Sequence, residues 1–227
     1  MTIFSPGLYA ILDLGSLGGR DPLLTGRALL EAGCVALQLR AKDRTTGELL
    51  PLARKLRALT QTHGVPLVIN DDPELAAAAE ADALHLGQSD TPLEDAKRLL
   101  RAGQRIGLST HELSQAEEAR ARGADYIGFG PIFPTATKVG AAPAQGVAAL
   151  REVCRRAGLP VVAIGGLTLE HVASVAEAGA AAAAVIGAVL TAENPGAAAR
   201  ELGERFRQGY SRGRSSISAF ENHPPSG

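Results

Sequence analysis

Eight short apolar runs, rich in Val, Ile and Leu, recur along the chain, and a charged amphipathic stretch follows each of them. Near-continuous apolar runs of this length are typical of strands that are buried on both faces, as in a parallel sheet. The runs are LYAILD (8–13), VALQLR (35–40), PLVIN (66–70), ALHLG (83–87), RIGLS (105–109), YIGFG (126–130), PVVAIGG (160–166) and AAAVIG (182–187).

Start and stop signals mark several of the intervening stretches as helices. A capping side chain followed by proline predicts three helix starts, at Asp72–Pro73, Thr91–Pro92 and Asn194–Pro195. Three glycines fall just after helical runs, where a left-handed C-terminal cap is expected: Gly33, Gly123 and Gly179. Each predicted strand is thus followed by a predicted helix.

Eight strand–helix units in one chain favour an α/β fold that is a single (β/α)8 TIM barrel over residues 1–209. An open, doubly wound sheet is the alternative, but it needs two edge strands, and no run here is polar enough for an edge. The pattern is lost over residues 210–227, where Ser, Pro and Gly accumulate. We therefore expect a disordered C-terminal tail there.

Composition excludes several classes of protein. Hydrophobic residues make up 45% of the chain and charged residues 21%, as in soluble globular proteins, and the net charge is −1. Such a balance gives no general attraction to nucleic acid or to acidic membranes, so any phosphate site must be a local cluster. No run is long enough to span a bilayer and the N-terminus lacks a signal-peptide pattern, so we expect a cytoplasmic protein. The sequence leaves a homo-oligomer open.

The two cysteines carry no recognisable motif. Cys34 and Cys154 lie far apart and form no C-x-x-C pair, which argues against a zinc site or a disulfide. We expect both to be small buried apolar side chains.

In a barrel, function is found where the strands end, and the second predicted strand ends in QLRAK. Gln38, Arg40 and Lys42 alternate, so an extended chain points all three the same way. Burying two cations among apolar helices is costly, so the mouth of the barrel is the better place for them. Arg and Lys together suit a polyphosphate, although surface salt bridges would explain the same pattern.

Carboxylates follow the next two strands. Asp72 is explained as a helix cap, which leaves Asn70 and Asp71 after the third strand and Asp90 after the fourth. Two carboxylates at one level beside cations suit a hard ion such as Mg²⁺, and a structural network with the cations is the alternative. His85, in the fourth strand, is expected to be a packed or hydrogen-bonded histidine.

The remaining strand ends offer hydroxyl groups, a stiff loop and glycines. Ser109 ends the fifth strand and either binds a phosphate oxygen or caps the next helix, while His111 is expected to be exposed. The sixth strand leads into GFGPIFPTATK (128–138), and glycines end the seventh and eighth strands, where such barrels commonly bind phosphate. These features predict two anion regions, one basic and metal-assisted, the other lined by backbone.

The motifs QLRAK, IND, HLGQSD, LST, GPIFPTATK, AIGG and VIG occur in this order and together resemble the thiamine phosphate synthase family, over roughly residues 8–205. The resemblance implies a (β/α)8 barrel that joins hydroxymethylpyrimidine diphosphate to hydroxyethylthiazole phosphate, with Mg²⁺ as cofactor. The products would be thiamine phosphate and diphosphate. The only partners it implies are these small-molecule substrates.

The resemblance also implies roles for individual residues. Asp71 and Asp90 would bind Mg²⁺, and the catalytic groups would be Arg40, Lys42, Ser109 and Lys138. Contacts to the pyrimidine diphosphate would come from Gln38, Arg40, Lys42, Asn70, Ser109 and Lys138, and contacts to the thiazole phosphate from Thr135, Thr137, Gly166, Ile186 and Gly187. Leu39, Ala41 and Ala136 adjoin these residues and complete the predicted substrate-binding set.

Three positions depart from the family's usual pattern. Ala41 stands where Glu is frequent, Gly187 where Ser is frequent, and Gly140 where an acid is frequent. The second departure would replace a hydroxyl contact to phosphate by backbone N–H groups. Two alternatives remain open: a thiazole tautomerase of the same barrel family, and a non-catalytic protein that binds thiamine precursors.

Overall fold

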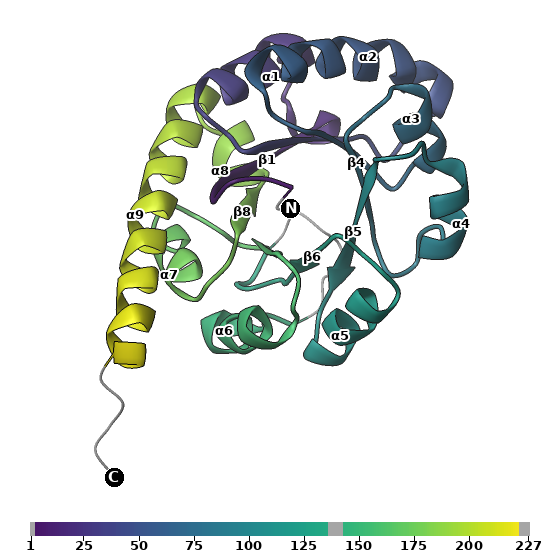
Figure 1. Cartoon of the computed structure of the whole chain (residues 1–227). Coiled ribbons are helices and arrows are strands. Elements are labelled where there is room, and N and C mark those ends of the chain that lie inside the picture. Colours follow the sequence, from purple (N-terminus) through teal and green to yellow (C-terminus); the bar gives the residue numbers. More distant parts are fainter. Residues whose placement is uncertain (1–2, 136–142, 223–227) are drawn as a thin grey trace.

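Eight parallel strands close into a barrel, and helices surround it (Figure 1). The computed structural model describes residues 3–135 and 143–222, and the side chains of these residues as far as 215. Strands neighbour one another in chain order, and the barrel closes where the first strand pairs with the eighth. The predicted (β/α)8 barrel is therefore confirmed.

All eight predicted strands are present, and their ends differ from the predicted runs by two residues at most. The strands are β1 (Gly7–Asp13), β2 (Ala36–Arg40), β3 (Leu67–Asn70), β4 (Ala83–Leu86), β5 (Arg105–Thr110), β6 (Tyr126–Phe129), β7 (Val161–Ile164) and β8 (Ala182–Val185). The helices are a short 3₁₀ turn η1 (Leu14–Ser16), α1 (Pro22–Glu31), α2 (Thr46–His63), α3 (Pro73–Ala78), α4 (Leu93–Leu99), α5 (Leu113–Ala121), α6 (Gly146–Arg156), α7 (Val172–Glu177), α8 (Gly187–Leu190) and α9 (Pro195–Asn222).

Two of the three predicted helix starts are confirmed. Asp72 Oδ1 accepts a hydrogen bond from Leu75 N at 2.8 Å, and Asn194 Oδ1 accepts one from Ala197 N at 3.0 Å. The prediction at Thr91 is wrong, because α4 begins later, after an extended Pro92 that occupies the cap position without a side-chain hydrogen bond. The three glycines expected in the left-handed region have φ values of 82°, 78° and 102°.

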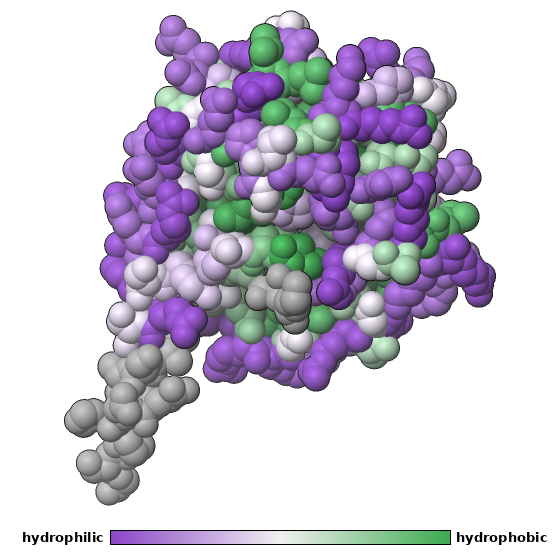
Figure 2. Space-filling model, turned by 45° about the horizontal axis from the view of Figure 1, so that its top comes forward, coloured by the Kyte–Doolittle hydropathy of each residue, from purple (hydrophilic) through white to green (hydrophobic). Residues whose placement is uncertain are grey.

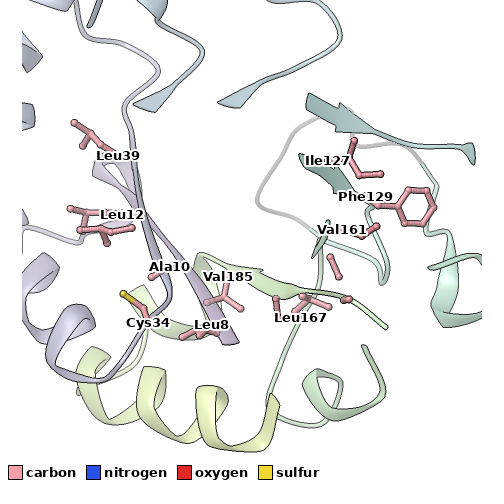
Figure 3. Close-up of a cluster of buried hydrophobic side chains, with 14 of the residues drawn as sticks. Leu8, Ala10, Leu12, Cys34, Leu39, Ile127, Phe129, Val161, Leu167 and Val185 are labelled. Atoms are coloured by element: carbon pink, nitrogen blue, oxygen red, sulfur yellow. The ribbon is translucent and has the colours of Figure 1, made fainter. Parts of the chain in front are cut away.

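Alternation along the strands divides the buried residues between two cores. One core fills the barrel and comprises Phe4, Tyr9, Ile11, Ala36, Val68, Ala83, Tyr126, Val162, Ala182 and Ala184. The other, larger core lies between the strands and the helices, and Figure 3 shows part of it, with Leu8 between β1 and α9. The outer surface is mostly hydrophilic in the view of Figure 2.

Helix α9 continues through residues 210–222, where the sequence analysis predicts a disordered tail. That prediction is wrong for these residues, because Gly213 within the segment, like Gly209 just before it, is a packing position. A Cβ on Gly209 would lie 2.4 Å from the carbonyl oxygen of Ala173, and one on Gly213 would lie 3.0 Å from Glu177 Cα. Arg212 adds an ion pair with Glu177 at 2.7 Å. Small residues thus let α9 lie close against α7.

Both cysteines are reduced, and neither forms a disulfide. Cys34 and Cys154 are both free thiols, and burial raises the pKa of each to about 12. The expected role of a small buried side chain is confirmed for Cys34, whereas Cys154 is half-buried and packs against the outer core. Within the described parts of the chain, no helix has both the length and the apolar character needed to cross a membrane.

Candidate active site

A cavity of about 630 Å³ lies where the carboxyl ends of the strands meet. Its walls contain residues from all eight strands or from the loops that follow them. The predicted site residues that line it are Gln38, Arg40, Lys42, Asn70, Asp71, Asp90, Ser109, Thr135, Gly166, Ile186 and Gly187. The fold therefore gathers residues that are separated by almost 150 positions in sequence.

Five members of the predicted set are not among those residues. Leu39 and Ala41 do not line this cavity, and their side chains pack in the outer core, as alternation from Arg40 requires. Ala136, Thr137 and Lys138 lie outside the described residues, as does Gly140.

Arg40 at the end of β2 is held by a carboxylate that the sequence analysis missed. Its guanidinium lies 3.0 Å from Oδ1 of Asp13 at the end of β1, and the Asp13 side chain is only 8% exposed. Ser16 donates to the other carboxylate oxygen at 2.8 Å. Asp13 could have been found, because it lies two positions after Ile11 on the same face as the barrel interior. The pair fixes a cation at the cavity wall.

Asp71 and Asp90 lie together, as expected. Asp71 has a φ of +64°, an uncommon conformation for a residue other than glycine. Burial and the adjacent Asp90 carboxyl raise the pKa of Asp71 to about 7, although Asn70 and Arg40 partly offset this effect. Asp90 also accepts a hydrogen bond from Gly87 N at 2.6 Å. The two carboxyl groups repel one another when both are ionised, so a cation would be favoured beside them.

Within the described residues there is no cluster of three or more His, Cys, Asp or Glu side chains around one point. A metal ion held by the aspartate pair would therefore need other ligands, such as water or substrate oxygens. That requirement fits Mg²⁺, which usually keeps several waters and binds through one or two carboxylates plus phosphate oxygens.

His85 is a hydrogen-bonded strand histidine, in agreement with the sequence analysis. Its Nε2 lies 3.0 Å from Ser109 Oγ and its Nδ1 lies 3.1 Å from the hydroxyl of Tyr126. Burial lowers the pKa of His85 to about 4, with a smaller opposing effect from Asp90. The imidazole is therefore neutral, and its second nitrogen meets a phenol rather than the carboxylate of a catalytic triad.

On the opposite side of the cavity, the backbone of the loop after β6 lies very close to Gly166. Gly166 has a φ of +65°, and a Cβ there would lie 2.4 Å from Pro134 O and 2.7 Å from Phe133 O. His171 accompanies this contact, since its ring stacks on Phe133 at 3.7 Å and its Nδ1 lies 2.9 Å from Gly166 O. The loop after β6 thus packs directly against the end of β7.

The position of His111 differs from the prediction. It was expected to be exposed, but it is half-buried, lines the cavity and bonds to the carbonyl oxygen of Gly130 through Nδ1 at 2.5 Å. The carbonyl group is part of the same β6 loop, so the histidine joins the loops after β5 and β6. Nothing in the local sequence pattern marks this long-range bond.

A parallel eight-stranded barrel with a charged and glycine-lined cavity at its carboxyl end is the architecture of a TIM-barrel enzyme that acts on a small molecule. The model of the thiamine monophosphate synthase family matches residues 8–189. Thiamine-phosphate synthase of Anaeromyxobacter dehalogenans is 45% identical over 203 residues, covering 89% of this chain and 89% of that protein.

Two further comparisons agree. Thiamine-phosphate synthase of Desulfitobacterium hafniense is 40% identical over 200 residues, covering 88% of this chain and 97% of that protein. The solved structure of thiamine phosphate pyrophosphorylase from Pyrococcus furiosus has a TM-score of 0.82 and 34% identity, covering 89% of this chain and 96% of that one. The chain therefore belongs to the thiamine monophosphate synthase family.

Proposed function

We propose that the cavity joins 4-amino-5-hydroxymethyl-2-methylpyrimidine diphosphate to 4-methyl-5-(2-hydroxyethyl)thiazole phosphate. The bond between the pyrimidine methylene carbon and the diphosphate oxygen breaks, and the thiazole nitrogen forms a new bond to that carbon. Diphosphate leaves with the electron pair of the broken bond, and thiamine phosphate is the other product. The protein is thus a transferase of a substituted methyl group.

One observation carries the proposal: the cavity has two chemically different sides. Arg40, Lys42 and the aspartate pair Asp71–Asp90 line one side, and the backbone around Gly166 and Gly187 lines the other. A substrate with one phosphate needs only one such region. Two regions in one cavity suit a reaction that brings together a diphosphate and a monophosphate.

The aspartate pair is where Mg²⁺ would be held. Each carboxyl group is oriented by the fold, Asp90 through Gly87 N and Asp71 through its left-handed backbone, and their mutual repulsion favours a cation. When bound, Mg²⁺ would neutralise charge on the diphosphate oxygens and so make diphosphate a better leaving group.

The described side chains supply the remaining electrostatic stabilisation on that side of the cavity. Arg40, fixed by Asp13, presents a guanidinium to the negative charge that develops on the leaving diphosphate. Lys42 lines the same side and adds a second cation. The sequence adds Lys138 to this group as a prediction, since it lies outside the described residues.

The thiazole phosphate is assigned to the opposite side. Helix α8 begins at Gly187, and the first backbone N–H groups of a helix have no partner within it. Gly187 and Gly166 carry no side chain that would keep a phosphate from the backbone. Thr135 lies on the same wall. This anchor would hold the thiazole nitrogen close to the carbon that it attacks, so no protein nucleophile is needed.

The assay that tests the proposal contains the protein, both phosphorylated substrates and Mg²⁺, and follows the formation of thiamine phosphate and diphosphate in equal amounts. Failure to form thiamine phosphate at any protein concentration would contradict it. Isomerisation of the thiazole phosphate alone would indicate the tautomerase, and binding without turnover would indicate the non-catalytic alternative.

A cytoplasmic location is part of the proposal. It is supported by two free thiols, which are typical of a reducing compartment, and by a net charge of −1 that favours neither nucleic acid nor acidic membranes. Fractionation of cells that express the chain would test it.

A further inference from the structure

A continuous chain of hydrogen bonds crosses the interior of the barrel from β2 to β5. Gln38 Nε2 donates to the hydroxyl oxygen of Tyr9 at 2.8 Å, and that oxygen lies 3.3 Å from the hydroxyl oxygen of Tyr126. Tyr126 meets His85 Nδ1 at 3.1 Å, and His85 Nε2 meets Ser109 Oγ at 3.0 Å. All five residues line the cavity.

The barrel is built around this chain. A Cβ on Gly107 would lie 2.1 Å from the Tyr126 ring, and a Cβ on Gly128 would lie 3.1 Å from the His85 ring. Gly107 lies in β5, which pairs with the strands of both rings, whereas Gly128 lies in β6 and the ring of His85 reaches it from β4 across β5. Phe4, which precedes β1, packs edge-on against Tyr9 and Tyr126, and its ring centroid lies 5.8 and 5.5 Å from theirs. The rings are therefore held in place by packing as well as by hydrogen bonds.

We propose that Tyr9, Tyr126 and His85 are positioning residues that set the hydrogen-bonding direction of the two substrate-facing ends of this chain. Gln38 then presents its carbonyl oxygen to the cavity as an acceptor, and Ser109 presents its hydroxyl proton as a donor. The inference rests on the proposed function for the identity of the substrate, and on the geometry for the direction of the chain.

The direction follows from counting protons. The Gln38 amide nitrogen can only donate, so the Tyr9 oxygen accepts from it, and the Tyr9 proton is then available to Tyr126, to which Tyr9 donates in the proposed direction. The Tyr126 proton then goes to His85 Nδ1. A neutral imidazole with an acceptor at Nδ1 carries its proton on Nε2, so His85 donates to Ser109 Oγ. Because Ser109 Oγ accepts from His85, its own hydroxyl proton is available to donate to a ligand in the cavity.

The reverse direction is less favourable. It would require Tyr126 to donate to Tyr9, either with the Gln38 amide turned over or with the Tyr9 oxygen accepting two hydrogen bonds, and every later bond would be inverted. Ser109 would then donate to His85 and present only lone pairs to the cavity. Lone pairs beside the oxygens of an anionic substrate repel, whereas a hydroxyl proton there forms a charge-assisted hydrogen bond.

The two ends fit complementary atoms of an aminopyrimidine diphosphate. An exocyclic amino group can donate to Gln38 Oε1, for which no partner is found among the described residues. A ring nitrogen or a diphosphate oxygen can accept from Ser109. The chain thereby orients the donor and the acceptor before the substrate arrives, which reduces the cost of ordering them on binding.

Nitrogen-15 NMR of the whole protein without substrate tests the direction. The protonated ring nitrogen of His85 is distinguishable from the unprotonated one, and a His85→Gln variant identifies the signals. We expect the proton on Nε2. A proton on Nδ1 would overturn the proposal whatever the activity of the protein.

Tyr126→Phe tests the function of the chain, because it keeps the ring and removes the hydroxyl. We expect kcat/KM for the pyrimidine diphosphate to fall by about ten- to a hundredfold, with KM for the thiazole phosphate unchanged. The His85 signals should also change to a mixture of the two tautomers. Tyr9→Phe is a second variant, which breaks the chain one bond earlier and should give the same pattern.

Tyr210→Phe is the matched control, since Tyr210 lies on α9 and stacks on Phe206 outside the barrel. It should leave both kinetic constants and the His85 signals unchanged. Equal kinetics for Tyr126→Phe, Tyr9→Phe and the control would overturn the positioning role. A parent protein that forms no thiamine phosphate would instead contradict the proposed function, while the NMR experiment would still decide the direction of the chain.

Discussion

Gly166→Ala should destabilise the protein by about 1–5 kcal/mol, because Gly166 has both a left-handed backbone and a crowded environment. Its φ of +65° costs a residue with a Cβ about 1–2 kcal/mol. The added Cβ would lie 2.4 Å from Pro134 O and 2.7 Å from Phe133 O. Both contacts are with backbone, which cannot rotate away, so overpacking adds about 1–3 kcal/mol. The lower entropy of the unfolded alanine chain offsets up to about 1 kcal/mol.

Thermal unfolding followed by circular dichroism measures this change. In a chain of this size each kcal/mol shifts Tm by about 2–4 °C, so we expect a decrease of about 2–20 °C. Gly187→Ala is the matched control from the same wall of the cavity, because a Cβ there has no atom within 4 Å and Gly187 has no left-handed backbone. Its Tm should change by no more than about 2 °C, since a Cβ that enters open space at this half-buried position displaces nothing and should change stability by about 0.5 kcal/mol or less.

The comparison separates a packing role from a role in binding alone. If the two alanine variants unfold at the same temperature, the loop after β6 does not depend on close contact with Gly166. Gly166 would then not be required for the close approach of the backbone at Phe133 and Pro134. A decrease confined to Gly166→Ala supports the packing role, and the shifted loop should then also raise KM for the thiazole phosphate.

Three further predictions concern ionisable groups. Asp71→Asn keeps a side chain that tolerates the left-handed backbone but removes a carboxylate, so Mg²⁺ binding measured by calorimetry should weaken at least tenfold, whereas Asp43→Asn on the exposed neighbouring loop should leave it unchanged. An unchanged titration in Asp71→Asn would make this carboxylate structural. Lys138→Ala should lower turnover by about a hundredfold or more without changing the circular dichroism spectrum, and normal turnover would remove Lys138 from the mechanism. The folded pKa of His85, about 4, lies below its ordinary value of 6.5, so its contribution to stability is complete above pH 6.5 and is lost as the pH falls toward 4. This loss is up to about 3 kcal/mol in urea unfolding, and a His85→Gln variant with an equally steep pH dependence would contradict the assignment.

The strands could be predicted because a parallel barrel buries both faces of each strand, which leaves an apolar run that few other structures require. Arg40 and Asp71 could be placed at the mouth by the same logic, since their positions directly follow such runs. These strand-end positions, together with the glycines after the seventh and eighth strands, were enough to predict two distinct anion regions. The local sequence pattern was therefore sufficient to predict those parts of the structure that burial alone determines.

Long-range contacts could not be predicted in this way. His111 is half-buried because a carbonyl group from the following loop meets it, and Tyr9 and Tyr126 meet although 117 positions separate them. The tail prediction failed for a related reason. Glycine and serine are common both in disordered segments and in helices that pack closely, and only the position of α7 against α9 distinguishes the two cases.

Glycine also explains how a small barrel accommodates a large polar site. Eight strands enclose an interior that side chains normally fill, so space for a ligand must come from positions that lack them. Gly107 and Gly128 leave room for the rings of Tyr126 and His85, which line the floor of the cavity. Gly166 lets the β6 loop pack closely at the rim. Charged residues supply attraction at this site, but glycines determine where the charges and rings can lie, so substitutions at these glycines should disturb the site as much as loss of a charge.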